Sequence, residues 1–124
     1  MKIGIIVAMD KEFVQLKALL ENATMEQHHK KDFAVGNIGD KDIVIQKCGI
    51  GKVNSAIGAV EMINNYAPDL VISTGVAGGA DVEMNVTDVI VGTSYCYHDA
   101  YCGSECSFGQ IIGMPPTFTA PKDS

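Results

Sequence analysis

The stretch from Asp69 to Gly79 constrains the fold most strongly. Residues 70–72 are a short apolar run, typical of a strand that is buried on both faces. The run continues into Thr74-Gly75 and ends at Gly78-Gly79. In an open α/β sheet, such a glycine turn presents backbone amides to a small ligand, although glycines also make ordinary turns. The sequence therefore predicts a central buried strand whose end is a candidate ligand site.

The N-terminal segment predicts a second buried strand followed by a helix. Lys2 to Val7 is apolar and rich in β-branched residues. Asp10 has a side chain suited to an N-cap. Apolar residues then recur at helical spacing, at Phe13, Leu16, Leu19 and Leu20. These features indicate a strand over residues 2–7 and a helix from about residue 10 to residue 22.

The next part of the chain predicts a β-hairpin. Residues 23–31 are polar, which favours a solvated loop or an edge strand over a metal or anion site at His28-His29. Two apolar runs follow at residues 32–38 and 43–48. Gly39 to Asp42, which lies between them, has the composition of a hairpin turn.

The segment Gly49-Ile50-Gly51-Lys52 leads from the hairpin into a second helix. It matches neither a P-loop nor a dinucleotide-binding fingerprint, because other residues occupy the required positions. A strand-to-helix turn with a close backbone approach remains. The helix is expected to end near Tyr66, and its apolar residues form one stripe, as for a helix with one buried face: Val53, Ala56, Ile57, Val60 and Ile63.

The order of the elements predicts an α/β fold in layers. Val86 to Val91 is expected to be another buried strand. The crossovers between strands are long enough for parallel pairing, so we expect a single domain over residues 1–124. Residues 99–124 have three prolines and no clean periodicity. This segment indicates either an arm that contacts a partner or a chain that stops before its fold is complete.

Composition narrows the classes of function. The 124 residues have a formal net charge of −6, and all nine basic residues are lysines. Nucleic-acid binders and phosphate-clamping proteins usually rely on arginine, so both classes are disfavoured. No stretch approaches the roughly 20 apolar residues of a membrane helix, and the N-terminal run is too short for an export signal. We therefore expect a cytoplasmic protein whose four cysteines are free thiols.

Glu12 is the first candidate for a chemical role. It falls in the first turn of the first predicted helix, beyond the carboxyl end of the first strand. Negative charge is favoured at a helix N-terminus, and this edge of an α/β sheet is where ligands usually bind. A carboxylate at this place could activate a water molecule. The alternative is an ordinary first-turn glutamate without a function.

A group of soft metal ligands near the C-terminus is the second candidate. It consists of Cys96, His98, Cys102 and Cys106. These residues could bind zinc, but their spacing fits no common zinc motif. His98 and Asp99 are adjacent, so on a strand their side chains would point to opposite faces and would not form a catalytic pair.

Several short segments carry a family resemblance when they are taken together. They are Met1–Ile6 with Ala8-Met9 and Glu12, Gly49–Asn54, Pro68-Asp69, Thr74–Gly79, Asp88–Val91, Tyr97–Ala100, Gly109-Gln110 and Gly113–Pro115. In this order they resemble the bacterial 5′-methylthioadenosine/S-adenosylhomocysteine nucleosidases of the purine/uridine phosphorylase family. The resemblance implies a three-layer α/β fold, with a mixed sheet flanked by helices, that is incomplete at the C-terminus.

The resemblance implies hydrolysis of the N-glycosidic bond between adenine and a 5′-thio-substituted ribose, in methionine salvage and the activated methyl cycle. Glu12 matches the glutamate that positions and deprotonates the attacking water. Met9 and Ile50 match positions near the ribose and the 5′-alkylthio group. Val76, Ala77 and Gly78 match the segment that lines the ribose and the purine. Val76 replaces a serine of some members, so one polar contact is expected to be absent.

The resemblance also implies partners. The substrate would be a small nucleoside thioether, with no cofactor, metal, nucleic acid or membrane involved. The family is typically homodimeric, and Tyr101 lies near an aromatic residue that reaches the pocket of the neighbouring subunit. The local chain length differs at Tyr101, so this correspondence is the weakest of the set.

Two departures from the family leave alternatives open. Phosphorylases of the superfamily hold phosphate with basic side chains and a Gly-Asp-Pro stretch, whereas this chain has Ala8-Met9-Asp10 and no arginine, which favours hydrolysis. Complete members are nearly twice as long, and their second half supplies the aspartate that protonates the leaving purine. A chain without that acid is expected to hydrolyse poorly. The alternative is a non-catalytic relative that binds an adenosine-like ligand or a partner chain.

Overall fold

A computed structural model describes residues 1–121. The described chain contains two compact units, one formed by Met1–Gly78 and one that begins at Gly79. The expected single domain over residues 1–124 stays a prediction. No helix in the described part is long and apolar enough to cross a membrane.

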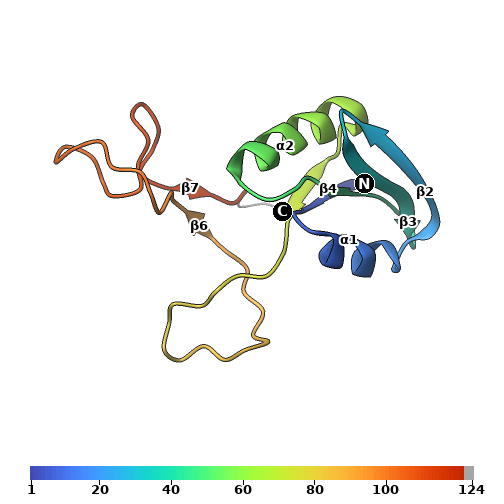
Figure 1. Cartoon of the computed structure of the whole chain (residues 1–124), viewed down its shortest axis with the longest axis horizontal. Helices are drawn as coiled ribbons and strands as arrows, with labels where there is room; N and C mark the ends of the chain where they lie inside the picture. The colour runs from blue at the N-terminus through green and yellow to red at the C-terminus, as the bar shows by residue number, and fades with distance from the viewer. Residues whose placement is uncertain (122–124) are drawn as a thin grey trace. The chain divides into compact units, whose positions relative to one another are not determined.

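The first unit is a five-stranded mixed sheet with two helices. The sheet order is β2-β3-β4-β1-β5, in which β4, β1 and β5 are parallel and β2, β3 and β4 are antiparallel. The elements are β1 (Lys2–Val7), α1 (Asp10–Lys17), β2 (Glu21–His28), β3 (Lys31–Ile38), β4 (Lys41–Lys47), α2 (Lys52–Tyr66) and β5 (Leu70–Ser73). The predicted α/β class with a mixed sheet between helices is confirmed (Figure 1).

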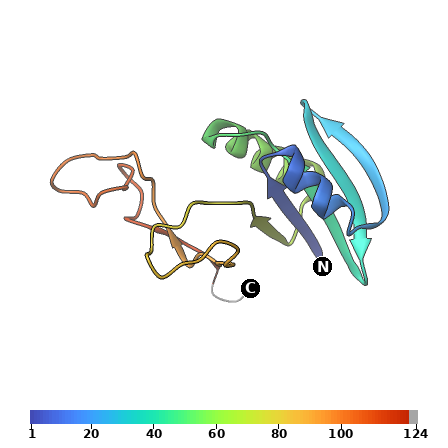
Figure 2. The same ribbon diagram turned by 60° about the horizontal axis from the view of Figure 1, so that its bottom comes forward.

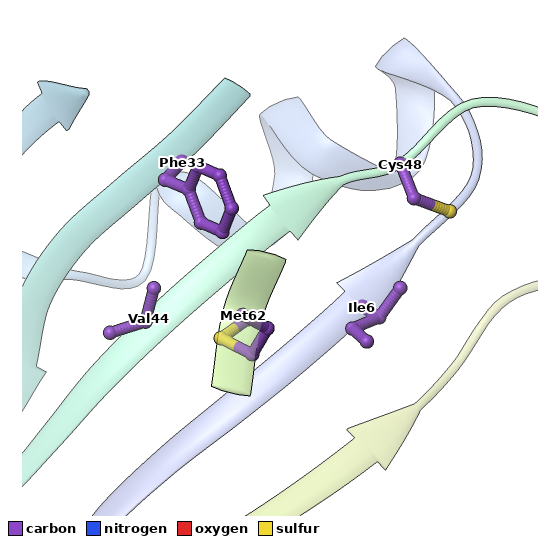
Figure 3. Packing of buried hydrophobic residues seen from close by; sticks show 5 residues of the cluster. All are labelled: Ile6, Phe33, Val44, Cys48 and Met62. Carbon is purple, nitrogen blue, oxygen red and sulfur yellow. The ribbon is translucent and has the colours of Figure 1, made fainter. Parts of the chain in front are cut away.

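Helix α2 covers one face of the sheet and α1 covers the other (Figures 1 and 2). Successive side chains of a strand point to opposite faces, so the apolar runs of β1, β3 and β4 supply two cores at once. The core under α2 is shown in Figure 3 and consists of Ile6, Phe33, Val44, Cys48 and Met62. The core under α1 consists of Val7, Phe13, Ala34, Ile43 and Ile45.

Helix α2 has the predicted bounds but buries a different face. Its apolar stripe is exposed, from 44% at Ile57 to 74% at Val53, whereas Gly58 and Met62 are buried. A Cβ atom at Gly58 would lie 2.6 Å from Cβ of Cys48, so the missing side chain lets the helix backbone approach the sheet. The close approach at Gly58 decides which face is buried, so the apolar stripe lies on the face turned away from the sheet.

Helix α1 is shorter than predicted. It ends at Lys17 instead of residue 22, and the chain turns into β2 at Glu21. Its N-cap is Met9 and not Asp10. Leu19 is exposed, because it lies in the turn that connects α1 to β2. Leu19 and Leu20 continue the helical spacing of apolar residues, but the chain leaves the helix before them and pairs with β3 from Glu21 onwards.

Strand β2 is an edge strand, as one of the two expectations for residues 23–31 stated. Its end is tied to α2 by polar contacts. The Tyr66 hydroxyl donates to Glu26 Oε1 at 2.9 Å, and His28 Nε2 lies 3.0 Å from the same hydroxyl. Burial, and then the bond and charge of Glu26, raise the pKa of Tyr66 above its ordinary value. His29 pairs with Glu61 of α2 at 2.7 Å.

Strand β5 is not the central buried strand that was predicted. It lies at the edge of the sheet and pairs with β1 (Figure 2). Val71 and Ile72 are 39% and 40% exposed. Apolar character alone could not show this, because burial of a strand depends on neighbours that are remote in sequence.

The second unit has little regular structure in its described residues. β6 (Ser94–Tyr95) pairs with β7 (Phe118–Thr119), and the rings of Tyr97 and Phe118 lie 6.3 Å apart. The predicted strand over residues 86–91 is wrong, since this segment is not a strand and Val86 and Val89 are exposed. Apart from β7, the described residues 99–121 contain no helix or strand, in line with the lack of periodicity in their sequence.

Candidate functional site

Three loops of the first unit meet at one edge of the sheet. They follow the carboxyl ends of β4, β1 and β5, which are adjacent and parallel with β1 in the middle. The Cys48 amide donates to Val7 O at 2.9 Å, and the Thr74 amide donates to Ile6 O at 3.1 Å. The helices that follow β1 and β4 lie on opposite faces of the sheet (Figure 1). A crevice at the carboxyl ends of strands, where the helices change sides, is the usual ligand position in α/β sheets.

Glu12 joins two of these loops. Its Oε2 accepts hydrogen bonds from the amides of Ala8 at 3.0 Å and Met9 at 3.1 Å. Its Oε1 accepts from the amide of Val76 at 3.3 Å. The carboxylate therefore folds back over the start of α1 and holds the end of β1 against the loop after β5.

Gly75 makes this position of Glu12 possible. A Cβ atom at Gly75 would lie 2.8 Å from Glu12 Oε1, closer than an ordinary van der Waals contact. A side chain at residue 75 would thus displace the carboxylate. The glycine turn after β5, the predicted ligand site, therefore has its backbone next to Glu12, the carboxylate that is predicted to activate water.

Lys47 anchors the first turn of α1 from the neighbouring strand. Its ammonium lies 2.7 Å from Asp10 and 3.3 Å from Asp32. Hydrogen bonds to these two carboxylates raise the pKa of Lys47. The pairs hold the start of α1, and with it Glu12, against the start of β3 and the end of β4.

The loop after β4 is held by a buried lysine. Lys31 Nζ donates to Cys48 O and to Asn54 Oδ1, and Asn54 Nδ2 donates to Ile50 O at 2.8 Å. Burial raises the pKa of the Cys48 thiol, and the nearby Glu12 carboxylate adds to the effect, whereas the Lys31 charge lowers it. The thiol of Cys48 therefore stays protonated and is not poised as a nucleophile.

The structure places most predicted site residues in these three loops. Met9 is half-buried and Ile50 is 72% exposed. Val76 is 81% exposed, and Ala77 and Gly78 are exposed beside it. These positions lie in the loops after β1, β4 and β5, and the amides of Met9 and Val76 contact Glu12 directly. Exposed apolar side chains at the carboxyl ends of parallel strands are typical of a surface that a ligand covers.

Tyr101 is the exception, because it belongs to the second unit. It is exposed, and its ring lies 6.1 Å from the ring of Phe108.

Three features of this site have no signal in the local sequence. Lysines are rarely buried, so Lys31 looked like part of a solvated polar segment. Asn54 is the last residue of the matching segment Gly49–Asn54, and nothing in that match indicates a bond to Lys31. The closeness of Gly75 to Glu12 joins residues far apart in sequence, and no local pattern could show it.

The soft ligands of the second unit do not assemble into a metal site. Within the described residues 1–121, no group of three or more cysteine, histidine or acidic side chains could hold a metal ion. All four cysteines are unpaired. His98 Nδ1 lies 3.9 Å from Asp99 Oδ1, so the expected separation of these side chains is wrong. The backbone bends at this point instead of forming a strand, and both side chains are exposed.

Comparisons with known proteins agree with the motifs. The phosphorylase superfamily matches residues 2–122. The 5′-methylthioadenosine/S-adenosylhomocysteine nucleosidase of Bacillus pumilus is 38% identical over 123 residues, and that of Desulfotalea psychrophila is 41% identical. Each alignment covers 98% of this chain and 53% of the relative. The chain thus spans about half the length of the curated relatives that it matches.

Solved structures give the same result. An S-adenosylhomocysteine nucleosidase from Streptococcus pyogenes, solved with a methylthio nucleoside analogue, matches with a TM-score of 0.92 and 31% identity. A methylthioadenosine/S-adenosylhomocysteine nucleosidase from Colwellia psychrerythraea, solved with adenine, matches with a TM-score of 0.94 and 35% identity. The matches cover 98% and 99% of this chain, and 52% and 51% of those chains.

Proposed function

This chain belongs to the phosphorylase superfamily, and from that membership we propose that it forms the water-activating side of a nucleosidase site. The reaction would be hydrolysis of the N-glycosidic bond of 5′-methylthioadenosine and S-adenosylhomocysteine, with release of adenine. The names of the relatives and the nucleoside-like ligands of the matched structures support this proposal.

The observation that carries the proposal is the environment of Glu12. A carboxylate oxygen has two lone pairs, and Oε2 already accepts two amide hydrogen bonds. Oε1 accepts one, from Val76, and keeps a lone pair for a further donor. A water molecule at Oε1 would be oriented and would lose its proton to the carboxylate as it attacks the sugar carbon. General base catalysis of this kind contributes about 10²–10⁴-fold.

The surroundings of Glu12 suit a nucleoside thioether. The exposed backbone and small side chains of Val76, Ala77 and Gly78 would line the ribose and purine. Met9 and Ile50 would cover the 5′-alkylthio group, since both are apolar and stand at the ends of β1 and β4. Negative charge at Glu12 would also stabilise the positive charge that develops on the sugar ring in the transition state.

A second function that the same crevice supports is binding without turnover. The alignment covers 53% of each relative, and the rest of each relative has no counterpart in these 124 residues. A leaving purine needs a proton, and loss of a general acid costs about 10²–10⁴-fold. As this second function, the 124-residue chain would bind the nucleoside and hydrolyse it too slowly for release of adenine to be detected.

Phosphorolysis is the less favoured reaction of the superfamily. Phosphate is usually held by arginine forks, and the sequence contains lysine as its only strongly basic residue type. No cofactor takes part in either reaction as we propose it. Methionine salvage and the activated methyl cycle are the pathways that would use the hydrolysis, in the cytoplasm, where unpaired cysteines stay reduced.

We further propose that the chain forms a homodimer through the exposed apolar stripe of α2. Val53, Ile57 and Val60 are exposed along one side of the helix, and contiguous apolar patches of this kind mark interaction sites. A second copy of the same helix would bury them symmetrically. From the family resemblance we also propose that Tyr101, which is exposed, contacts the pocket of the neighbouring subunit.

Sedimentation of Val60→Lys tests the dimer. We expect the wild-type chain to sediment as a dimer and the variant as a monomer. Gln15→Lys adds the same charge to an exposed position of α1 and should remain dimeric. A wild-type monomer at all concentrations would refute the proposal.

Adenine release from methylthioadenosine, measured with and without phosphate, tests the reaction. We expect release at the same rate in both buffers, because water is the acceptor. A rate that requires phosphate would show phosphorolysis instead. Saturable binding without any release would leave the second function in place of the first.

A further inference from the structure

The loop between β4 and α2 has a conformation that needs support. Gly49 and Gly51 have φ values of +94° and +99°, a region that other residues rarely adopt. Glycine gains access to this region at the cost of a larger loss of conformational entropy on folding. Ile50 stands between the two glycines and is mostly exposed, so its own side chain does not anchor the loop.

Lys31 supplies one part of the support. It is the first residue of β3, it is 9% exposed, and its ammonium donates to Cys48 O and to Asn54 Oδ1 at 2.7 Å. Both acceptors are neutral oxygens. Burying an ammonium is costly unless its donors are used. The two bonds therefore connect the start of β3 to Cys48 on one side of the loop and to Asn54 on the other.

Asn54 passes this support on to Ile50. Its side-chain amide accepts from Lys31 with Oδ1 and donates with Nδ2 to Ile50 O at 2.8 Å. A Cβ atom at Gly49 would lie 3.1 Å from Asn54 Cγ, so the amide also packs closely under the loop. Two side-chain bonds thus connect Lys31 through Asn54 to the carbonyl of Ile50, and a third connects Lys31 directly to the carbonyl of Cys48.

We infer that Lys31 is a positioning residue, which fixes the loop of residues 48–52 through Cys48 O and Asn54 and so places Ile50 at the crevice. The inference rests on the proposed function, in which Ile50 contacts the 5′-alkylthio group of the ligand. Lys31 itself touches no ligand. Loss of its ammonium removes the donor to the buried carbonyl of Cys48 and to the half-buried Oδ1 of Asn54 and frees the loop, so the contact made by Ile50 is lost while the purine wall after β5 is unchanged.

The first measurement is the mobility of the Ile50 amide by ¹⁵N relaxation, which needs no ligand. The variant Lys31→Met removes the ammonium and keeps a similar length, and Lys30→Met changes the exposed neighbour as a matched control. In the wild type we expect an order parameter of about 0.85, and in Lys31→Met a value below about 0.6. Lys30→Met should match the wild type. An unchanged value in Lys31→Met would overturn the inference.

A second variant tests the relay without removing Lys31. Asn54→Asp keeps an acceptor for the ammonium and loses the donor to Ile50 O. We expect the order parameter of Ile50 to fall here too, so the inference can be tested even if Lys31→Met does not fold. A rigid Ile50 in Asn54→Asp would overturn the role of Asn54 and with it the inferred connection.

The last measurement compares two ligands by calorimetry. We expect Lys31→Met to bind methylthioadenosine about tenfold more weakly, the usual size of a lost apolar contact, and to bind adenine as the wild type does. Equal losses for both ligands would show a general structural defect and overturn the inference. If the wild-type chain binds neither ligand, the proposed function fails, and the relaxation data alone decide whether Lys31 holds the loop.

Discussion

Replacing Gly75 with alanine would displace the Glu12 carboxylate without changing Glu12 itself. The new Cβ would lie 2.8 Å from Oε1, so the carboxylate would have to retreat. A retreat of about 0.5 Å lengthens the 3.3 Å bond from the Val76 amide beyond hydrogen-bond range. The two bonds to Ala8 and Met9 can persist, because they use the other oxygen. The loop after β5 would thus lose its tie to α1.

The expected effects of Gly75→Ala are modest on stability and larger on chemistry. A hydrogen bond to a charged group contributes about 1.5–3 kcal/mol, and this one is long and partly solvated, so we expect a loss of about 1 kcal/mol in the free energy of unfolding. Misplacement of a catalytic group by a fraction of an ångström lowers the rate of adenine release by about tenfold. Urea unfolding and single-turnover adenine release measure the two effects.

Gly79→Ala is the matched control for Gly75→Ala. A Cβ atom at Gly79 would meet the flexible end of the Met84 side chain, which can move aside. We expect this variant to unfold and react as the wild type does. If Gly75→Ala behaves like Gly79→Ala in both assays, the contact between Gly75 and Glu12 does not position the carboxylate.

Three further predictions concern the rest of the first unit. Because the pKa of Tyr66 is raised, the folded phenol stays neutral while the unfolded phenol ionises near pH 10. The stability that this phenol contributes is complete below that pH and is lost as the pH rises. The free energy of unfolding should therefore fall less steeply in Tyr66→Phe than in the wild type between about pH 9 and 11. Lys47→Met loses the ion pairs with Asp10 and Asp32, so its free energy of unfolding should be lower than that of the wild type by up to about 1 kcal/mol at low salt, and by less in 1 M NaCl. If urea unfolding gives the same loss at both salt concentrations, the anchor is not electrostatic. Gly58→Ala should lower the thermal midpoint more than Ala56→Gly does, since its Cβ would collide with Cys48; a reversed order would contradict the close helix approach.

Local patterns predicted the elements that depend on residues close in sequence. The strand over residues 2–7, the hairpin of β3 and β4, and the bounds of α2 follow from hydrophobic periodicity and from glycine turns. The position of Glu12 at the carboxyl end of β1 followed in the same way. These features are confirmed because each is decided within a few residues.

Contacts between distant residues decided what the sequence could not show. The face of α2 that is buried depends on the fit of Gly58 against Cys48, and the exposure of β5 depends on its place in the sheet. The bond from the Val76 amide to Glu12 spans 64 residues, and that from Lys31 to Asn54 spans 23. Periodicity does not report such pairs, so the site was predicted as separate segments without its connecting contacts.

Adenine release under single-turnover conditions by Glu12→Gln tests the central claim most directly. Glutamine keeps the size of the side chain and an acceptor for the backbone amides but cannot take a proton from water. We expect methylthioadenosine to bind within about twofold of the wild-type affinity and adenine release to fall by at least about 100-fold. Equal rates of release in Glu12→Gln and wild type would contradict the assignment of Glu12 as the base.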